Sequence, residues 1–283
     1  MKIKEVGVVG CGLMGSGIAQ VCAQAGYQVA VSEINQDLLQ KGLNNIKRFL
    51  AKGVERGKVA QEEMDAALAR IQGTVDIQDF KDCDLVIEAI IENMEAKKEI
   101  FSSLDGICPP HTILASNTSS LCITEIASAT KRGEKVVGLH FFNPVPLMRL
   151  LEIVRTILTS EETFRRARKF GESLGKEIVV AKDTPGFIVN LLLIPYLLDA
   201  IRALENGVAT KEDIDKSMVL GLNHPMGPFT LLDLLGLDTT LFIADAMYGE
   251  FKDSRYAVPP LLRRMVTAGH LGRKTGKGFY DYS

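Results

Sequence analysis

The chain has 283 residues, of which 46% are hydrophobic and 24% are charged. This balance is typical of a folded globular protein, and the length suffices for one large or two modest domains. The formal net charge of −2 argues against a general role in binding nucleic acid or membrane surfaces. No apolar run reaches the roughly 18 residues of a membrane span, and the chain enters its first strand without room for a signal peptide. We therefore expect a cytoplasmic protein.

The amino-terminal segment predicts one strand–helix–strand unit. Residues 6–9 are an apolar run typical of a strand buried on both faces, and residues 18–25 are small and apolar, as in a helix packed closely on a sheet. Residues 27–32 predict the second strand, and Glu33 stands at its C-terminal end. Between the first strand and the helix lies a glycine-rich turn, Gly10-Cys11-Gly12-Leu13-Met14-Gly15.

The glycine-rich turn, in this context, predicts a dinucleotide site. Gly10 permits the tight turn, Gly12 lets the backbone approach a pyrophosphate, and Gly15 lets the helix pack close to the strand. The N-terminus of the helix that follows then offers free N–H groups and the positive end of its dipole to the phosphates, and Leu13 and Met14 of the turn are also expected to contact the cofactor. A lone glycine motif is weak, but here a strand precedes it and a helix follows it.

Glu33 indicates which dinucleotide is bound. A carboxylate at this position takes the adenine ribose hydroxyls and repels the extra phosphate of NADP, so we expect NAD. Two alternatives stay open at this point, namely an ordinary surface acid and a site for FAD.

The rest of the chain predicts two domains. Residues 36–51 predict a helix that continues into a basic, glycine-broken arm at 52–58. The remaining strands are expected at 84–89, 112–115, 135–139, 150–154 and 177–180. Helical patterns between most of these strands favour an α/β fold with a Rossmann-type, doubly wound, mostly parallel sheet.

Strand signals end near Asp183, so we expect residues 1–183 to form an NAD-binding Rossmann domain and residues 184–283 an all-helical substrate and dimerisation domain. The expected helices of the second domain span 187–206, 211–220, 229–235 and 239–248. The first of them is apolar on every side. We therefore expect it to pack on a partner subunit in a homodimer or a higher homo-oligomer.

Four histidines are candidates for acid–base chemistry. His140 follows the strand 135–139, and the C-terminal strand ends of an open α/β sheet face the ligand crevice, which places this residue beside the cofactor. His111 is expected in an exposed turn and His270 at the surface. His224 could contact the substrate, but the sequence favours a position without substrate contact. Removal of a hydroxyl proton during hydride transfer needs a base that titrates near neutral pH, which favours His140.

Glu152 is the candidate partner of that histidine. It lies in an apolar strand, where a charge is costly unless it is paired. A carboxylate there would orient an imidazole and stabilise its protonated form. The alternative is an acid on an edge strand.

Two further polar features remain ambiguous from the residues alone. The segment 115–120 follows a strand and carries Asn117 and Ser119, which can donate to an oxygen or to the nicotinamide carboxamide, or can cap a helix expected to start near Leu121. Asn190 lies inside an apolar run, and its amide must either bond within the core or face the crevice.

Five segments in order resemble the L-3-hydroxyacyl-CoA dehydrogenase family, and more closely its short, free-standing 3-hydroxybutyryl-CoA dehydrogenases. They are Gly10-Cys11-Gly12-Leu13-Met14-Gly15-Ser16-Gly17, Ser116-Asn117-Thr118-Ser119-Ser120-Leu121, Gly138-Leu139-His140-Phe141-Phe142-Asn143-Pro144, Asp183-Thr184-Pro185-Gly186-Phe187 with Asn190, and Gly272-Arg273-Lys274-Thr275-Gly276-Lys277-Gly278-Phe279-Tyr280. The resemblance covers essentially the whole chain. It departs at Glu33, where the family more often has Asp.

The resemblance implies a role for several of these residues. His140 would be the catalytic base, with Glu152 as its carboxylate partner. Ser119 would bond the reacting oxygen of the substrate, and Asn190 would help to hold the substrate. The remaining positions that match the cofactor site, near the nicotinamide end, are Glu92, Lys97 and Lys274. The reaction implied is the interconversion of (S)-3-hydroxybutyryl-CoA and acetoacetyl-CoA, or of longer homologues, with NAD.

The resemblance also gives the basic arm a purpose. Lys52 and Arg56 are four residues apart and share one face if helical, with Lys58 close by. Such a face would suit the phosphates of coenzyme A. The alternative is a solvated helix surface.

Three other functions compete with this one. Ser119, His140 and Glu152 also fit a hydrolase triad, although no GxSxG elbow surrounds any of these serines and a hydrolase has no use for the NAD turn. A dehydrogenase of free sugar acids, as in the related gulonate dehydrogenases, would not need the basic arm. A non-catalytic binder would not need the set of polar residues Ser119, His140, Glu152 and Asn190.

The five cysteines form no CxxC pair or zinc-type cluster, so we expect free thiols in a reducing compartment and no metal.

Overall fold

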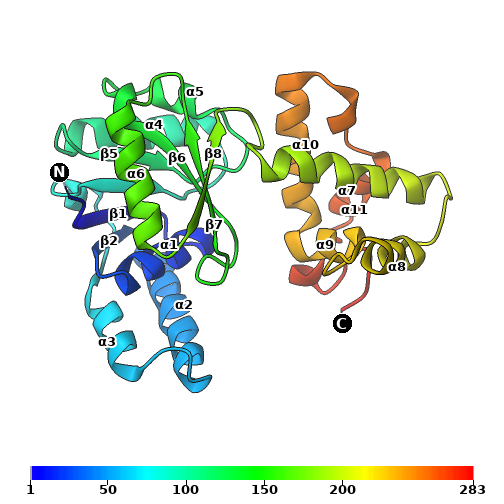
Figure 1. Cartoon of the computed structure of the whole chain (residues 1–283), viewed down its shortest axis with the longest axis horizontal. Helices are drawn as coiled ribbons and strands as arrows, with labels where there is room; N and C mark the ends of the chain where they lie inside the picture. Colours follow the sequence, from blue (N-terminus) through cyan, green and yellow to red (C-terminus); the bar gives the residue numbers. More distant parts are fainter. Residues whose placement is uncertain (1, 283) are drawn as a thin grey trace. The chain divides into compact units, whose positions relative to one another are not determined.

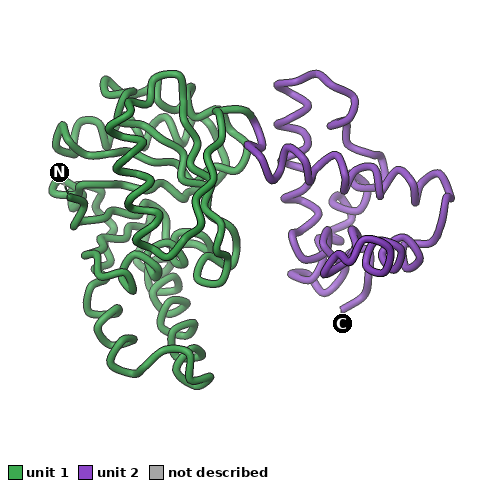
Figure 2. The backbone as a smooth tube through the Cα atoms, in the orientation of Figure 1, with its two compact units in different colours: residues 1–184 green, residues 185–283 purple. Residues whose placement is uncertain are grey.

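The computed structural model describes residues 2–282 and divides into two compact units, residues 1–184 and 185–283 (Figures 1 and 2). Each unit has its own apolar core. Among the described residues, no helix is long and apolar enough to cross a membrane.

The first unit is built on one eight-stranded sheet. The strands are β1 Glu5–Val9, β2 Gln28–Ser32, β3 Ile71–Thr74, β4 Leu85–Glu88, β5 Ile113–Ser116, β6 Val136–Phe141, β7 Leu150–Arg155 and β8 Glu177–Lys182. Their spatial order is β3-β2-β1-β4-β5-β6-β7-β8. Every neighbouring pair is parallel except β6 and β7, which are antiparallel. The mostly parallel, doubly wound sheet predicted from the sequence is therefore confirmed.

The helices of the first unit are α1 Leu13–Gln24, α2 Gln36–Glu55, α3 Gln61–Ala69, α4 Met94–Ile107, α5 Ile123–Ala127 and α6 Glu161–Ser173. Short 3-10 turns lie at Ile77–Phe80 and Gly133–Lys135. Helix α2 buries Leu39, Gly42, Ile46 and Leu50, which recur every three to four residues and so form one face. In Figure 1, α2 and α3 extend away from the sheet as a pair.

Two elements of this unit are not predicted by the hydrophobic pattern of the sequence. Strand β3 and helix α3 were not predicted. Strand β3 has the sequence IQGT and none of its four residues is buried, so it lacks the apolar run that marks the central strands.

Strand β7 is not an edge strand, because it pairs with both β6 and β8. The interpretation of Glu152 as an edge-strand acid is therefore wrong.

The second unit is a bundle of helices around a separate core. The helices are α7 Val189–Glu205, α8 Lys211–Leu222, α9 Pro228–Leu235, α10 Leu237–Phe251 and α11 Pro260–Thr267, with 3-10 turns at Ser254–Tyr256 and Arg273–Thr275. The sequence predicts the first four but not α11, which is short, is preceded by its N-cap residue Pro259 and begins at Pro260. Helix α7 starts two residues later than expected, because Phe187 has a left-handed backbone with φ of 50°.

Candidate active site

The glycine-rich turn has the shape that a bound dinucleotide requires. Strand β1 lies between β2 and β4, so the strand order reverses at β1 and opens a crevice beyond the carboxyl ends of the strands. Gly10 has a φ of +93°, and a Cβ there would lie 2.7 Å from the carbonyl oxygen of Ala89. A Cβ on Gly15 would lie 1.8 Å from the carbonyl oxygen of Gly10. Neither position tolerates a side chain.

Gly12 differs from its two neighbours in the turn. A Cβ there would meet no atom within 4 Å, so the space above it is open to a ligand. Helix α1 begins at Leu13 with neither a side-chain cap nor an acidic residue in its first turn. Its first N–H groups and the positive end of its dipole therefore face this open space, which fits a pyrophosphate.

Glu33 lies beside the turn. One carboxylate oxygen accepts a hydrogen bond from the backbone N–H of Cys11 at 2.8 Å, and the other accepts one from Ile34 at 3.1 Å. The longer side chain, compared with aspartate, is thus held against the glycine turn at the end of β2. Each oxygen keeps a second lone pair for a ribose hydroxyl.

His140 and Glu152 form the most buried part of the site. The two residues lie directly opposite each other on β6 and β7, and His140 Nδ1 is 2.6 Å from Glu152 Oε2. Their side chains are 4% and 0% exposed. Because a carboxylate only accepts, Nδ1 carries the proton and Nε2 presents a lone pair when the ring is neutral. His140 lies one residue inside the end of β6, not beyond it as the sequence suggested.

Ser119 approaches the other nitrogen of the same ring. Its Oγ is 3.2 Å from His140 Nε2. The segment that carries it follows β5 and is bound to neighbouring strands, because the backbone N–H of Asn117 donates to the carbonyl of Glu88 and the Asn117 side chain accepts from the backbone N–H of Phe141. Asn117 therefore joins the ends of β4, β5 and β6.

Glu92 and Lys97 lie next to this segment. A carboxylate oxygen of Glu92 accepts the backbone N–H of Ser119 at 2.8 Å, and it also bonds the Thr118 hydroxyl. The ammonium of Lys97 lies 3.1 Å from Glu92 and 2.6 Å from Glu88. Glu88 was not singled out from the sequence. Its signal is an acid that ends the apolar strand β4, where all four residues are buried.

The prediction that some of the residues 116–120 cap a helix starting near Leu121 needs correction. Helix α5 begins at Ile123, and its N-cap residue Cys122 makes no side-chain cap. The carboxylate of Asp183 accepts the backbone N–H groups of Ile123 and Thr124 at 2.9 and 2.6 Å. An acid some 60 positions along the chain caps this helix, which only the tertiary fold can bring about.

Asn190 and Lys274 belong to the second unit. Asn190 lies in the first turn of α7 and is buried. Lys274 is half-exposed and forms an ion pair with Asp238 at 2.6 Å. The motif around Lys274 has a structural function, because the N–H groups of Phe279 and Tyr280 donate to the buried Asp233. The assignment of Asn190 to the substrate and of Lys274 to the cofactor stays a prediction.

The basic arm lies at the far end of α2. Lys52 is in the last turn of α2, and Arg56 is the C-cap residue that follows the last helical residue, Glu55. Both side chains are exposed, as is Lys58. Within residues 2–282, none of the three has a carboxylate within ion-pair distance, so their charges are available to an anion.

The remaining histidines lie apart from this arrangement. His111 is 3.1 Å from Asp84 at the opposite ends of the strands, so it is a paired residue and not simply an exposed turn residue. His224 follows α8, and its ring packs edge-on against Tyr196. His270 is half-buried after α11.

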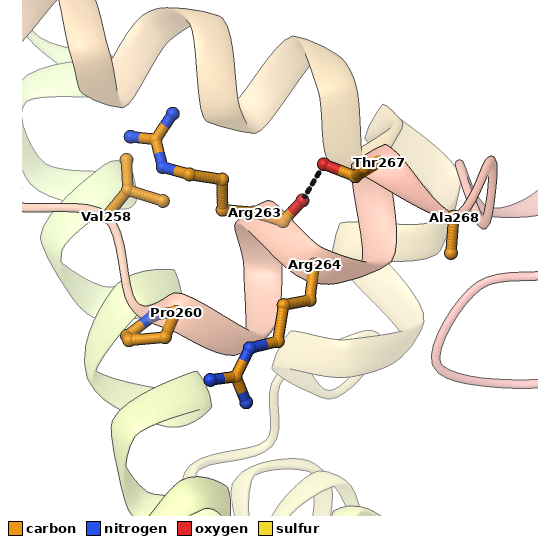
Figure 3. A pocket seen from close by; sticks show the side chains of 6 residues that line it. All are labelled: Val258, Pro260, Arg263, Arg264, Thr267 and Ala268. Carbon is orange, nitrogen blue, oxygen red and sulfur yellow. Dashed lines mark hydrogen bonds between the residues drawn. The ribbon is translucent and has the colours of Figure 1, made fainter.

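Three alternatives to this site carry less support. A hollow of about 580 Å³ on α11 is lined by Val258, Pro260, Arg263, Arg264, Thr267 and Ala268 (Figure 3). It holds none of the predicted site residues, and the Arg263 guanidinium is paired with Asp245. All five cysteines are free thiols, and burial raises the pKa of Cys11 to about 12, which makes it a poor nucleophile. Across residues 2–282, no three His, Cys, Asp or Glu side chains gather as a metal site.

These features define a class of protein. A glycine turn at the switch point of a doubly wound sheet, with a histidine and a carboxylate on neighbouring strands, is the architecture of a dinucleotide-dependent dehydrogenase. The family model for the 3-hydroxyacyl-CoA dehydrogenase NAD-binding domain matches residues 5–184, and the model for its C-terminal domain matches residues 186–282. The chain belongs to the 3-hydroxyacyl-CoA dehydrogenase family, and its cofactor is NAD.

Individual relatives agree over the full length. The chain is 52% identical to a 3-hydroxybutyryl-CoA dehydrogenase of Mycobacterium tuberculosis over 282 residues, which is 99% of each protein. It is 47% identical to a 3-hydroxybutyryl-CoA dehydrogenase of Clostridioides difficile, again over 99% of each. The crystal structure of an (S)-3-hydroxybutyryl-CoA dehydrogenase from Ralstonia eutropha is 44% identical, covers 100% of both chains and superimposes with a TM-score of 0.95.

Proposed function

We propose that this chain interconverts (S)-3-hydroxybutyryl-CoA and acetoacetyl-CoA, with NAD as the hydride carrier and His140 as the acid–base group. The observation that carries the proposal is the series Glu152–His140–Ser119 at the edge of the sheet where β5 and β6 end, with contacts of 2.6 and 3.2 Å. Similarity to 3-hydroxybutyryl-CoA dehydrogenases over 99% of the chain supports the choice of substrate.

His140 performs the proton transfer. With Nδ1–H donated to Glu152, the lone pair of Nε2 takes the hydroxyl proton of the 3-hydroxyacyl group as the C–H bond breaks. Bound NAD⁺ supplies the acceptor for the hydride that leaves the same carbon. In the reverse direction, the protonated ring returns the proton to the alkoxide oxygen that forms from the 3-oxo group.

Glu152 and Ser119 support this transfer from the two sides of the ring. The Glu152 carboxylate stabilises the imidazolium that forms, and it holds the ring in one tautomer and orientation. The Ser119 hydroxyl, 3.2 Å from Nε2, donates to the substrate oxygen and helps to polarise the carbonyl during reduction. Asn190 is proposed to hold the thioester, and Lys52 and Arg56 to bind the coenzyme A phosphates.

A spectrophotometric assay tests the proposal. NADH oxidation is followed at 340 nm with acetoacetyl-CoA, with longer 3-oxoacyl-CoAs and with NADPH in place of NADH. We expect turnover with acetoacetyl-CoA and NADH. A parallel assay without cofactor, in which a thiol reagent detects released coenzyme A, tests the hydrolase alternative. Thioester hydrolysis without NADH oxidation would contradict the proposal.

We also propose that the protein forms a homodimer or a higher homo-oligomer through its second unit. Leu192 on α7 is 70% exposed, Leu220 on α8 is 73% exposed, and Leu234 and Phe242 are exposed on α9 and α10. Exposed leucines on neighbouring helices are typical of a surface that another subunit covers. Sedimentation equilibrium tests this, and a monomer would exclude it. A cytoplasmic location remains part of the proposal.

A further inference from the structure

Three charged side chains form a compact cluster at the carboxyl end of β4, which we call the Glu88 cluster and define as Glu88, Glu92 and Lys97. The ammonium of Lys97 lies 2.6 Å from Glu88 and 3.1 Å from Glu92. The side chains of Lys97 and Glu88 are 1% and 0% exposed, and that of Glu92 is 25% exposed. A single cation is thus shared by two carboxylates away from bulk water.

The hydrogen bonds around the Glu88 cluster all point toward the oxygens of its two acids. Glu88 accepts from Lys97 and the backbone N–H of Ile90 on one oxygen, and from the Ser116 hydroxyl at 2.7 Å on the other. Glu92 accepts from the Ser119 backbone and from Lys97. Each of these neighbours donates to a glutamate oxygen. Two carboxylates and one ammonium give the cluster a net charge of −1.

The fold gives the position of this charge relative to NAD. The glycine turn after β1 receives the pyrophosphate, and Glu33 at the end of β2 marks the adenosine side. The nicotinamide half must therefore extend to the other side of β1, over the ends of β4 and β5. Glu88 ends β4 and Ser116 ends β5, so the cluster underlies this half of the cofactor site.

We infer that the Glu88 cluster sets the relative affinity of the protein for oxidised and reduced cofactor. The nicotinamide ring carries a positive charge in NAD⁺ and none in NADH. A net charge of −1 beneath the ring stabilises the oxidised form, and it does so strongly because the cluster is shielded from water. Glu88 contributes this charge without reaching the cofactor itself, so it acts as a positioning and electrostatic residue. The inference rests on the use of NAD, but not on the acyl-CoA substrate.

Structural support alone does not account for the second carboxylate. One carboxylate suffices to pair Lys97, and buried ion pairs contribute little net stability because desolvation offsets their attraction. Glu88 already pairs Lys97, so the contact of Lys97 with Glu92 leaves one negative charge uncompensated. That excess charge is what distinguishes the two oxidation states of the cofactor.

The test is Glu88→Gln, which keeps the shape of the side chain and removes its charge. Dissociation constants for NADH and NAD⁺ are measured by the fluorescence of NADH and by its displacement. We expect the dissociation constant for NAD⁺ to rise roughly tenfold while that for NADH changes little. Glu125→Gln is the matched control, because Glu125 on α5 forms a 2.6 Å ion pair with Lys98, the residue that follows Lys97 on α4. The control should leave the ratio of the two constants unchanged.

Each result decides the matter. An unchanged ratio in a folded Glu88→Gln protein, or equal losses for both cofactor forms, would overturn the inference and leave a structural role. If that variant does not fold, Glu92→Gln must shift the ratio in the same direction, since Glu92 is more exposed; an unchanged ratio there would also overturn it. Wild-type protein that binds both forms but does not turn over acetoacetyl-CoA would contradict the proposed function alone.

Discussion

His140 and Glu152 are cross-strand partners in the single antiparallel pair of the sheet, and their side-chain atoms Nδ1 and Oε2 are 2.6 Å apart. Residues directly opposite each other on neighbouring strands point to the same face, so the register of β6 and β7 is sufficient to bring the two together. The loop between them is also held in place. Lys176 donates to the carbonyl oxygens of Val145 and Met148 at 2.5 and 2.7 Å. The geometry of this pair therefore follows from the register of the sheet.

His140→Gln should retain cofactor binding and lose most of the turnover. Removal of a general acid–base group lowers kcat by about 10²–10⁴-fold, whereas the glycine turn that holds the cofactor is untouched. Steady-state kinetics with acetoacetyl-CoA and a fluorescence titration with NADH measure the two properties. Near-normal turnover by the variant would remove His140 from its proposed role.

Glu152→Gln should lower kcat by about a hundredfold with little change in the KM for either substrate. The glutamine can still accept the Nδ1–H, but it no longer stabilises the imidazolium with a full negative charge. Circular dichroism and thermal melting serve as the control for folding, because the side chain is completely buried. A proportionate loss of kcat and thermal stability would assign Glu152 a structural role instead.

The glycines of the turn should separate binding from folding. Gly12→Ala places a methyl group in open space, so the melting temperature should stay within a few degrees while the dissociation constant for NADH rises at least tenfold. Gly15→Ala places a methyl group 1.8 Å from the carbonyl oxygen of Gly10 and should destabilise the protein by several kcal/mol. Thermal melting and NADH titration are compared for both. Equal behaviour of the two variants would contradict the proposed geometry.

Arg56→Glu should raise the KM for acetoacetyl-CoA about tenfold and leave the KM for NADH nearly unchanged. The exposed guanidinium at the end of α2 is proposed to meet the coenzyme A phosphates, and charge reversal would repel them. Arg48→Glu is the matched control, because Arg48 is exposed on the same helix and bonds only the neighbouring Asn45 among the contacts described. Equal effects of the two reversals would reduce the role of Arg56 to general surface charge.

Asp84 should make the stability of the first unit depend on pH. Burial raises the pKa of this carboxyl, but hydrogen bonds from the backbone N–H groups of Glu5 and Lys4 and from His111 outweigh it and hold the pKa below its ordinary value of 3.8. A pKa lowered by folding stabilises the native state above the ordinary value, and this contribution is lost as the pH falls through the lowered pKa.

Urea denaturation across the pH range measures this contribution. Asp84→Asn should have a lower free energy of unfolding than the wild type at pH 7, and the two should converge below pH 4. Asp82→Asn, an exposed neighbour, should match the wild type throughout. A constant difference between Asp84→Asn and the wild type at all pH values would show that charge is not involved.

The sequence predicts the dinucleotide half of the site well, because that half is local. The turn, its flanking strand and helix, and Glu33 lie within about thirty consecutive residues, and the structure reproduces the steric reason for a glycine at Gly10 and at Gly15. The central strands are also predicted from their apolar runs, since a strand buried on both faces must be apolar throughout. Strand β3 and helix α11 were missed because neither carries such a pattern.

The rest of the site depends on contacts between residues that are far apart in the sequence. The sequence marks His140 and Glu152 as candidates, but the antiparallel register that joins them is set by the order of strands in the sheet. It offers residues 116–120 as helix caps, whereas Asp183 caps α5. It marks Glu88 only as an acid at the end of an apolar strand, because the partners Lys97 and Ser116 lie on the next helix and the next strand. A buried charge becomes interpretable only when its neighbours are known, because burial without a partner is costly and the partner is chosen by the fold.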